Sequence, residues 1–162
     1  MVILSLLAGL AIPRVRAFQA RARDARRIQD LAVLQQAIEA FRQDRGRYPA
    51  FDAEVSGWDS SSDGDLASEL ITESFLRAAP RDPLEDGQHS IRYRVYPMGS
   101  HGCFGPGPYY VLGLQNLETD WARERFQSHF ACPANSWEDE LAYSTGGGAT
   151  FTAPGPPSGP GL

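Results

Sequence analysis

The feature that most constrains this chain is the stretch from Arg14 to Arg45, which contains neither glycine nor proline. Alanine, arginine, glutamine and leucine dominate it, and all four favour the α-helix. In its second half, five apolar residues recur every three or four positions and so share one helix face: Ile28, Leu31, Leu34, Ile38 and Phe41. We expect this stripe to pack the helix onto a head formed by the rest of the chain. The charged residues that fall off the stripe are expected to be solvated: Arg26, Arg27, Asp30 and Arg42.

Two residues predict where this helix ends. Gly46 can adopt the left-handed conformation of a helix cap, and Pro49 cannot continue a helix. We therefore place a stalk helix at residues 13–47. Because its first half lacks the apolar stripe, we expect that half to be covered by something other than its own head.

An uncharged apolar run, MVILSLLAGLAI, occupies residues 1–12. As a helix it would span about 18 Å at about 1.5 Å per residue, which is less than the hydrocarbon core of about 30 Å. It also lacks the preceding basic residues and the small-x-small cleavage site of a signal peptide. We interpret it as a truncated membrane or filament-core segment, while a buried core helix or strand remains compatible with the run.

Charge is distributed unevenly along the chain, whose net charge is −5 and whose 15 basic residues are all arginine. Residues 1–49 hold nine arginines and four acidic residues, a net charge of +5, and the remainder carries −10. A basic helix and an acidic head would attract one another between neighbouring copies, or bring the helix to an anionic membrane face. The acidic remainder argues against nucleic-acid binding.

Residues 48–144 have the pattern of a small globular head. Residues 91–96 alternate apolar or aromatic side chains with arginine, which is typical of a half-buried antiparallel strand. Residues 109–114, YYVLGL, predict a second strand. The glycine- and proline-rich residues 98–108 between them are expected to form a long hairpin loop.

Two short helices are predicted in the head, at residues 66–76 and 117–126. Trp121 and Trp137 are expected to be packing anchors near the two cysteines. Glycine and proline dominate residues 145–162, for which we expect a flexible tail rather than folded structure.

The chain contains two cysteines, Cys103 and Cys132. In an exported protein an even number favours a disulfide, which here would close a loop of about 30 residues and contribute on the order of 3 kcal/mol. Two free thiols in a cytosolic protein are the alternative. His101 and His129 would also permit a zinc site with the cysteines, but the spacing from His101 to Cys103 is tighter than zinc fingers use.

Oxygen-bearing side chains alternate from Asp59 to Asp65, with Gly64 where a calcium loop turns. Position twelve of such a loop is Leu70, which has no carboxylate, so we interpret the segment as an acidic surface turn. We predict no metal ligands and no cofactor. Because glycine-rich phosphate loops and a Gly-x-Ser-x-Gly motif are absent from the sequence, we also expect no catalytic residues and no enzymatic activity.

Three consecutive features carry a family resemblance. Residues Ala11–Arg14 read Ala-Ile-Pro-Arg, an alanine- and arginine-rich helix follows, and an Asp-x-Gly-x-Tyr-Pro motif comes last, formed by Asp44, Gly46, Tyr48 and Pro49. The combination resembles the type IV pilin-like proteins, which include the major pseudopilins of type II secretion systems. It implies an α+β fold, in which a long N-terminal helix packs as a stalk on a small antiparallel β-sheet head.

Within this resemblance, Pro13 matches the family's helix-kinking proline. The positions that pack stalk on head match Asp30, Leu31, Ala37, Ile38 and Phe41. The family's basic leader, prepilin-peptidase site and early glutamate do not occur in the sequence, which opens inside the apolar segment. We therefore interpret the chain as N-terminally truncated, with its native start upstream of Met1.

The resemblance implies a structural subunit of a type IV pilus-like or type II secretion pseudopilus filament. Such a subunit would assemble through its N-terminal helix with other pilin-like subunits, aided by an inner-membrane platform and its ATPase. It would pass once through the cell membrane before it joins an extracellular or periplasmic filament. The alternative is a membrane-anchored, adhesin-like binding module that never polymerises.

Overall fold

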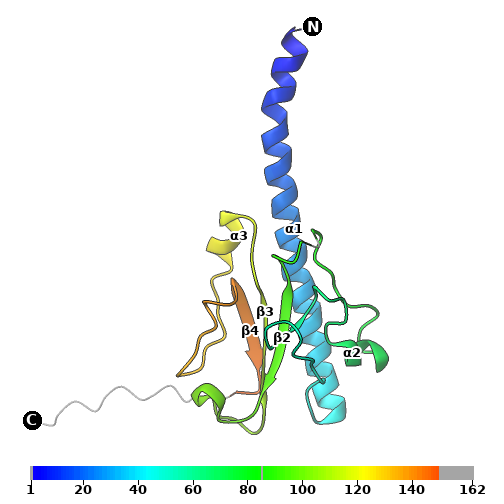
Figure 1. Cartoon of the computed structure of the whole chain (residues 1–162), viewed down its shortest axis with the longest axis vertical. Helices are drawn as coiled ribbons and strands as arrows, with labels where there is room; N and C mark the ends of the chain where they lie inside the picture. The colour runs from blue at the N-terminus through cyan, green and yellow to red at the C-terminus, as the bar shows by residue number, and fades with distance from the viewer. Residues whose placement is uncertain (1, 85, 150–162) are drawn as a thin grey trace, which may run out of the picture.

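One long helix and one antiparallel sheet make up most of the protein. The computed structural model describes residues 2–84 and 86–149, with side chains from residue 14 onward. The helix α1 (Val2–Arg45) packs along a four-stranded sheet, and its N-terminal half extends beyond the sheet (Figure 1). This is the α+β, pilin-like architecture expected from the sequence. α1 includes Pro13, but that side chain, and with it the predicted kink, lies outside the described residues.

The end of α1 is capped as predicted. Gly46 has a φ of 72°, and its N–H donates to the carbonyl oxygen of Arg42 at 2.9 Å, as in a left-handed helix cap. Tyr48 and Pro49 follow and are both buried. The carbonyl oxygen of Pro49 accepts a hydrogen bond from the hydroxyl of Tyr93 at 3.0 Å, so the capped end of the helix is joined to the sheet.

The sheet has the strand order β1-β2-β3-β4, and all neighbouring strands are antiparallel. The strands are β1 (Asp59–Ser60), β2 (Ile91–Tyr96), β3 (Tyr109–Leu114) and β4 (Tyr143–Gly147). β2 and β3 coincide with the two predicted strands, and Tyr96 pairs with Tyr109 at the start of their hairpin. The connecting loop contains a short 3₁₀ turn, η1 (Ser100–Gly102).

β3 is buried along its whole length because both faces of the sheet are covered. Alternate residues of β3 join the larger hydrophobic core against α1: Tyr110, Leu112 and Leu114. Tyr109 and Val111 join a second cluster that contains Trp137 and both cysteines. The sheet therefore separates a core shared with the stalk from a smaller core closed by loops.

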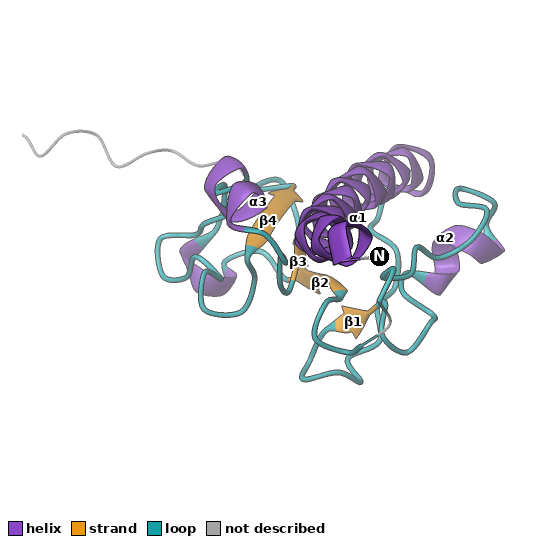
Figure 2. Cartoon of the chain, turned by 90° about the horizontal axis from the view of Figure 1, so that it is seen from above, coloured by secondary structure: helices purple, strands orange, loops and turns teal. Residues whose placement is uncertain are grey.

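Two short helices flank the sheet and α1 on opposite sides (Figure 2). They are α2 (Ser68–Thr72) and α3 (Asp120–Arg125), and both were expected from the sequence. α2 is shorter than the predicted helix at 66–76. Ala67 before it has a φ of 49° and Ser74 after it a φ of 65°, and these left-handed conformations do not belong inside a right-handed helix.

The predicted flexible tail begins too early, because residues 145–147 belong to β4 and pair with β3. A glycine-rich composition also suits a strand that must approach its neighbours closely. A Cβ atom at Gly146 would lie 2.4 Å from the carbonyl oxygen of Tyr110, and one at Gly147 would lie 2.4 Å from Oε1 of Glu39. The prediction from residue 150 onward lies outside the described residues.

Two further expectations for the head are wrong in part. Asp59 and Ser60 are buried in β1, because their backbone pairs with the edge of β2 and is drawn into the sheet. The acidic turn is therefore not wholly a surface feature. Trp137 is buried beside the cysteines, but Trp121 is 40% exposed on α3 and contacts Phe126 instead.

Candidate functional site

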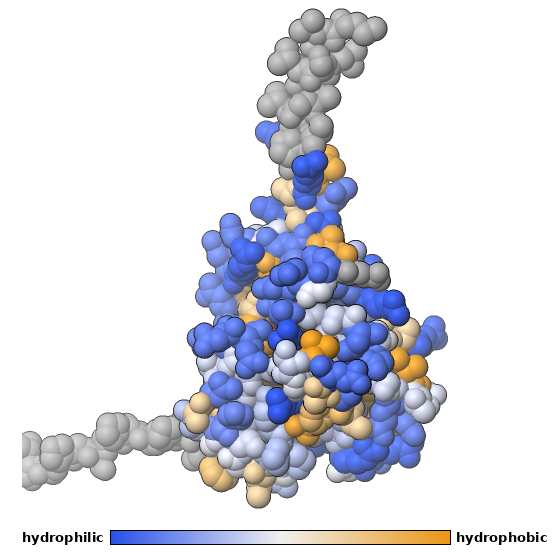
Figure 3. Space-filling model, in the orientation of Figure 1, coloured by the Kyte–Doolittle hydropathy of each residue, from blue (hydrophilic) through white to orange (hydrophobic). Residues whose placement is uncertain are grey.

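The part of α1 beyond the head is an exposed surface, which we call the projecting segment (residues 14–22). All of its side chains are exposed except that of Ala20, which is half-buried. Val15 is 53% exposed and Phe18 74% exposed. Orange apolar and blue hydrophilic side chains lie next to each other where the helix leaves the head (Figure 3). Val15 and Phe18 are three positions apart, so they lie on the same side of the helix, and both are open to solvent.

The head covers α1 from the next turn onward, and the predicted apolar stripe makes this contact. Four of the five stripe residues are fully buried in the core: Leu31, Leu34, Ile38 and Phe41. Ile28 is partly buried and packs against the same core. The face of α1 that the periodicity selects is therefore the face that lies on the sheet.

A group of buried and half-buried charged side chains lies where the projecting segment ends. We call it the arginine cluster, and its members are Arg23, Asp24, Arg27, Asp82 and Glu118. Arg27 is only 2% exposed. Its Nε and Nη2 donate to the two carboxylate oxygens of Asp82, and its Nη1 donates to Asp24 at 2.8 Å and to Glu118 at 2.6 Å. Arg23 donates to both oxygens of Glu118, at 2.9 and 2.6 Å.

Asp24 links the arginine cluster to the backbone of the head. One of its oxygens accepts from the N–H of Glu118 at 3.0 Å, and the other accepts from the N–H and the hydroxyl of Thr119 at 2.9 and 2.8 Å. Thr119 is in turn the N-cap of α3, and its hydroxyl accepts from the N–H of Ala122. The buried carboxylate thus positions the start of α3 against α1.

The electrostatics of the cluster follow from this bonding. Burial alone disfavours the charged form of Arg27, but hydrogen bonds to Asp82 and Glu118 outweigh it, so the pKa of Arg27 is raised. Hydrogen bonding from Arg23, supported by Arg27, lowers the pKa of Glu118 to about 2 against the opposing effect of burial. Arg27 and Glu118 are therefore held in their charged forms at neutral pH.

Sequence reasoning missed this cluster and placed Arg27 in solvent, which is wrong. Its partners Asp82 and Glu118 lie 55 and 91 positions away, so helical periodicity could not reveal them. Arg26 is exposed as expected, whereas Asp30 and Arg42 are half-buried. The available signal was local: an acid and an arginine three positions apart on the helix can pair.

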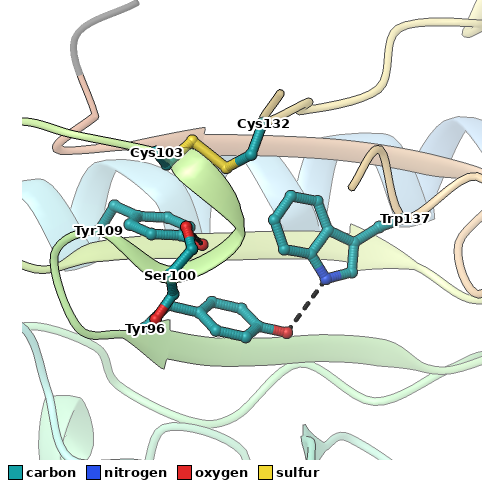
Figure 4. Close-up of a disulfide and its surroundings, with 6 residues drawn as sticks. All are labelled: Tyr96, Ser100, Cys103, Tyr109, Cys132 and Trp137. Atoms are coloured by element: carbon teal, nitrogen blue, oxygen red, sulfur yellow. Dashed lines mark hydrogen bonds between the residues drawn. A yellow bond between two sulfur atoms is a disulfide. The ribbon is translucent and has the colours of Figure 1, made fainter. Parts of the chain in front are cut away.

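The cysteines close the other face of the sheet. Cys103 and Cys132 form a disulfide with their Cα atoms 5.2 Å apart, so neither sulfur is a thiolate that could bind zinc. In Figure 4, Tyr96, Tyr109 and Trp137 lie beside the bridge, and Nε1 of Trp137 donates to the hydroxyl of Tyr96 at 3.0 Å. These contacts join the β2–β3 loop to the chain that precedes β4.

Two groups of side chains in the head, one with a histidine and one of carboxylates alone, have the spacing of metal ligands. One consists of Asp82, Asp86 and His89, and it borders a cavity of about 210 Å³. Its carboxylates already have hydrogen-bond donors, because Asp82 binds Arg27 and Asp86 accepts from the His89 ring at 3.0 Å. The other consists of Asp52, Asp59 and Asp65.

The shifted pKa of Glu118 predicts how stability changes in acid. A carboxyl whose pKa falls from 4.5 to about 2 on folding stabilises the fold fully above about pH 5, and this contribution is lost as the pH falls toward 2. The contribution is on the order of 3 kcal/mol. We expect denaturant unfolding between pH 2 and 7 to show a shallower loss of stability for Glu118→Gln than for the unaltered chain. The exposed Glu138→Gln serves as control, and equal pH slopes in all three proteins would contradict the prediction.

No helix among the described residues combines the length and the apolar composition needed to cross a lipid bilayer. The predicted membrane segment at residues 1–12 has side chains outside the described part, so single-pass anchoring remains a prediction.

Comparison with known proteins finds a sequence similarity to a secretion protein. Over 124 residues the chain is 23% identical to the type II secretion system core protein G of Escherichia coli (strain K12), an alignment that covers 74% of this chain and 82% of the relative. No protein-family model and no solved structure matches the chain.

Proposed function

We propose that this chain is a non-enzymatic structural subunit of a type II secretion pseudopilus or a related pilus-like filament. The observation that carries the proposal is the projecting segment, which extends beyond the head with Phe18 74% exposed. An isolated subunit leaves Val15 and Phe18 in water, and packing against helices of neighbouring subunits would bury them.

The arginine cluster also supports the proposal, because it fixes the head on its own helix. A filament built on helices needs each head to keep a fixed position on its own helix. Arg27 and Asp24 are buried and bind both the segment before β2 and the start of α3. The cluster thus joins α1 to two separate parts of the head immediately below the projecting segment.

Charge complementarity would set the register between copies. The projecting segment presents Arg14, Arg16 and Arg21 to solvent, whereas residues 138–140 of the head are three consecutive exposed acids. Opposite charges on two surfaces of the same molecule favour contacts between neighbouring copies. Further partners of the subunit would be an inner-membrane assembly platform with its ATPase, and the membrane itself. An anionic membrane surface would attract the exposed arginines of the projecting segment.

The similarity to a core protein of the type II secretion system favours the pseudopilus over a pilus. It also favours a filament on the periplasmic side of the inner membrane. The alternative, a membrane-anchored adhesin-like module that never polymerises, shares the long helix but does not need contacts between projecting segments.

Cross-linking through the projecting segment separates these functions. We expect Phe18→Cys, produced together with a type II secretion machinery and treated with a thiol-specific bifunctional reagent, to form covalent dimers, because neighbouring helices would bring equivalent positions together and each chain offers one free thiol. The native cysteines are joined to each other and do not react. Denaturing gel electrophoresis provides the measurement.

Phe104→Cys is the matched control, because Phe104 is a similarly exposed phenylalanine, at 65%, but lies on the head. We expect few or no covalent dimers from it. Absence of covalent dimers from Phe18→Cys would favour the non-polymerising module, and equal dimer yields from both positions would indicate nonspecific association.

A further inference from the structure

Trp121 differs from the other two tryptophans of the chain in being open to solvent. It lies on α3 and is 40% exposed, whereas Trp58 and Trp137 are 1% and 2% exposed in the second hydrophobic cluster. Its ring contacts that of Phe126 edge-on, with 6.3 Å between the centroids. The guanidinium of Arg125 lies 5.9 Å from the centroid of the indole. The indole is thus positioned by two neighbours and still presents a large part of its surface to solvent.

Trp121 and Arg125 form one outward surface of α3. They are four positions apart and so lie on the same side of the helix, whereas Ala122 is buried and packs α3 onto the head. An indole has an apolar body and a polar N–H, and an arginine has an apolar stem and a charged head. Side chains of this kind are enriched where proteins contact the boundary between lipid and water.

The position of α3 singles this pair out, because a lone exposed aromatic side chain is common on protein surfaces. α3 lies at the end of the head from which the projecting segment leaves (Figure 1). The N–H and the hydroxyl of Thr119, the N-cap of α3, donate to Asp24 of α1. α3 therefore begins at the level of Asp24, beside the part of α1 that would approach a membrane.

The length of α1 sets how far α3 lies from the lipid. Asp24 follows Arg14 by ten positions, which is about 15 Å along a helix. The headgroup layer outside the hydrocarbon core is about 5–8 Å thick. Helices in membranes tilt by up to about 40°, and packed helices lie about 8–10 Å apart. With the hydrocarbon beginning just before Arg14, a tilt of about 30° toward α3 would bring α3 to about 8 Å from it, at the edge of the headgroups.

Charge would draw this end of the molecule to the same surface. The exposed arginines of the projecting segment and of α3 are Arg14, Arg16, Arg21, Arg123 and Arg125. The exposed acids of these two segments are Asp120 and Glu124, so five positive charges face two negative ones, a net charge of +3. The whole chain carries −5. An anionic lipid surface would therefore attract this end and repel the rest of the head.

We propose that α3 contacts the anionic surface of the membrane that holds the subunit, with Trp121 among the lipid headgroups and Arg125 beside a lipid phosphate. The inference rests on the proposed membrane-anchored stage of the subunit and adds a contact made by the head itself. Two contacts, one through α1 and one through α3, would fix the tilt of the subunit before it joins a filament. A neighbouring copy could also cover Trp121, but that contact would require neither lipid nor the basic charge.

Tryptophan fluorescence tests the proposal in the whole 162-residue chain. The chain is bound to vesicles of phosphatidylcholine and phosphatidylglycerol whose acyl chains carry bromine just below the headgroups, because bromine quenches tryptophan on contact. Trp58 and Trp137 are shielded by burial, so quenching reports on Trp121. We expect the emission to fall and to shift to shorter wavelength, and we expect weaker quenching on brominated vesicles of phosphatidylcholine alone.

Three variants serve as comparisons. Trp121→Phe removes the reporter, and we expect no quenching from it. Phe104→Trp added to that variant places an exposed tryptophan in the loop between β2 and β3, at the other end of the head (Figure 1), and we expect no quenching there either. Arg125→Gln keeps much of the side chain but not its charge, and we expect it to weaken the contact by up to about fivefold.

Flotation of the vesicles separates this inference from the function on which it rests. A chain that floats with the vesicles but shows no quenching of Trp121 would overturn the contact through α3 and leave the anchored subunit intact. A chain that does not float would contradict the anchored stage as well. Equal quenching at positions 104 and 121 would overturn the proposal, because the head would then touch lipid without a preferred orientation. Covalent dimers from Trp121→Cys, in place of quenching, would assign α3 to a contact between copies.

Discussion

Replacement of Arg27 by alanine is expected to lower the free energy of unfolding by about 3–5 kcal/mol, because it leaves buried carboxylates without their counter-charge. Arg27 binds Asp24, Asp82 and Glu118 at once and is 2% exposed. Arg23 would remain, but it contacts only Glu118 among these acids. Asp24 and Asp82 would therefore be left as buried, unpaired charges, and the contact between α1 and the head would weaken.

Urea unfolding followed by circular dichroism measures this change, and Arg26→Ala is the matched control. Arg26 is the neighbouring arginine, its side chain is 65% exposed, and its pairing with Asp30 is loose at 3.7 Å. We expect that variant to lose less than about 1 kcal/mol. Arg27→Lys should fall between the two, because an ammonium keeps the charge but cannot bind both oxygens of Asp82 in parallel. Equal losses from Arg26→Ala and Arg27→Ala would show that burial of the cluster contributes nothing to stability.

The sequence predicts those parts of this fold that depend on periodicity and local turn chemistry. The stripe from Ile28 to Phe41 identifies the buried face of α1, and Gly46 identifies its end. Alternation along residues 91–96 gives β2 its bounds. In each case a few neighbouring residues suffice, because burial on one face imposes a repeat of two or of about 3.6 positions.

Periodicity and local turn chemistry do not predict contacts between segments that are far apart in the sequence. The arginine cluster depends on Asp82 and Glu118, and nothing near either residue marks it as a partner of Arg27. Asp59 is buried because the strand β1 pairs with β2. β1 has only two residues, which are too few to show a repeating pattern in the sequence. The strand β4 is missed because close approach to Tyr110 and Glu39 requires glycine, the residue that otherwise indicates a loop.

The first of these failures falls on a part of the molecule that supports the functional proposal. The apolar stripe of α1 shows which face of the helix is buried, but it does not by itself specify which head packs there or in what position. The position of this head on this helix depends on the buried charges around Arg27. These buried charges break the rule that charged groups stay in solvent, and such exceptions are expected at functional sites.

Loss of the disulfide is expected to lower the free energy of unfolding by about 3–4 kcal/mol in the loop-entropy model, given the 29 positions between Cys103 and Cys132. Both cysteines are buried, so the double replacement by alanine avoids placing new hydroxyls in the core. We expect hydrogen exchange to show lost protection in the loops around Cys103 and Trp137. Protection should persist in α1 near Phe41, because that core lies on the opposite face of the sheet.

Reduction of the unaltered chain is the matched control for this pair of substitutions, because it opens the same loop without changing any side chain but the two thiols. If chain entropy dominates, the reduced protein and the double variant should lose the same stability within about 0.5 kcal/mol. A larger loss in the double variant would instead come from packing of the missing sulfur atoms against Tyr109 and Trp137. A loss below about 1 kcal/mol in both proteins would mean that the aromatic cluster holds the two loops without the bridge. In that case the bridge would still form in an oxidising compartment, where disulfides persist, but the packing of the aromatic side chains would fix the two loops.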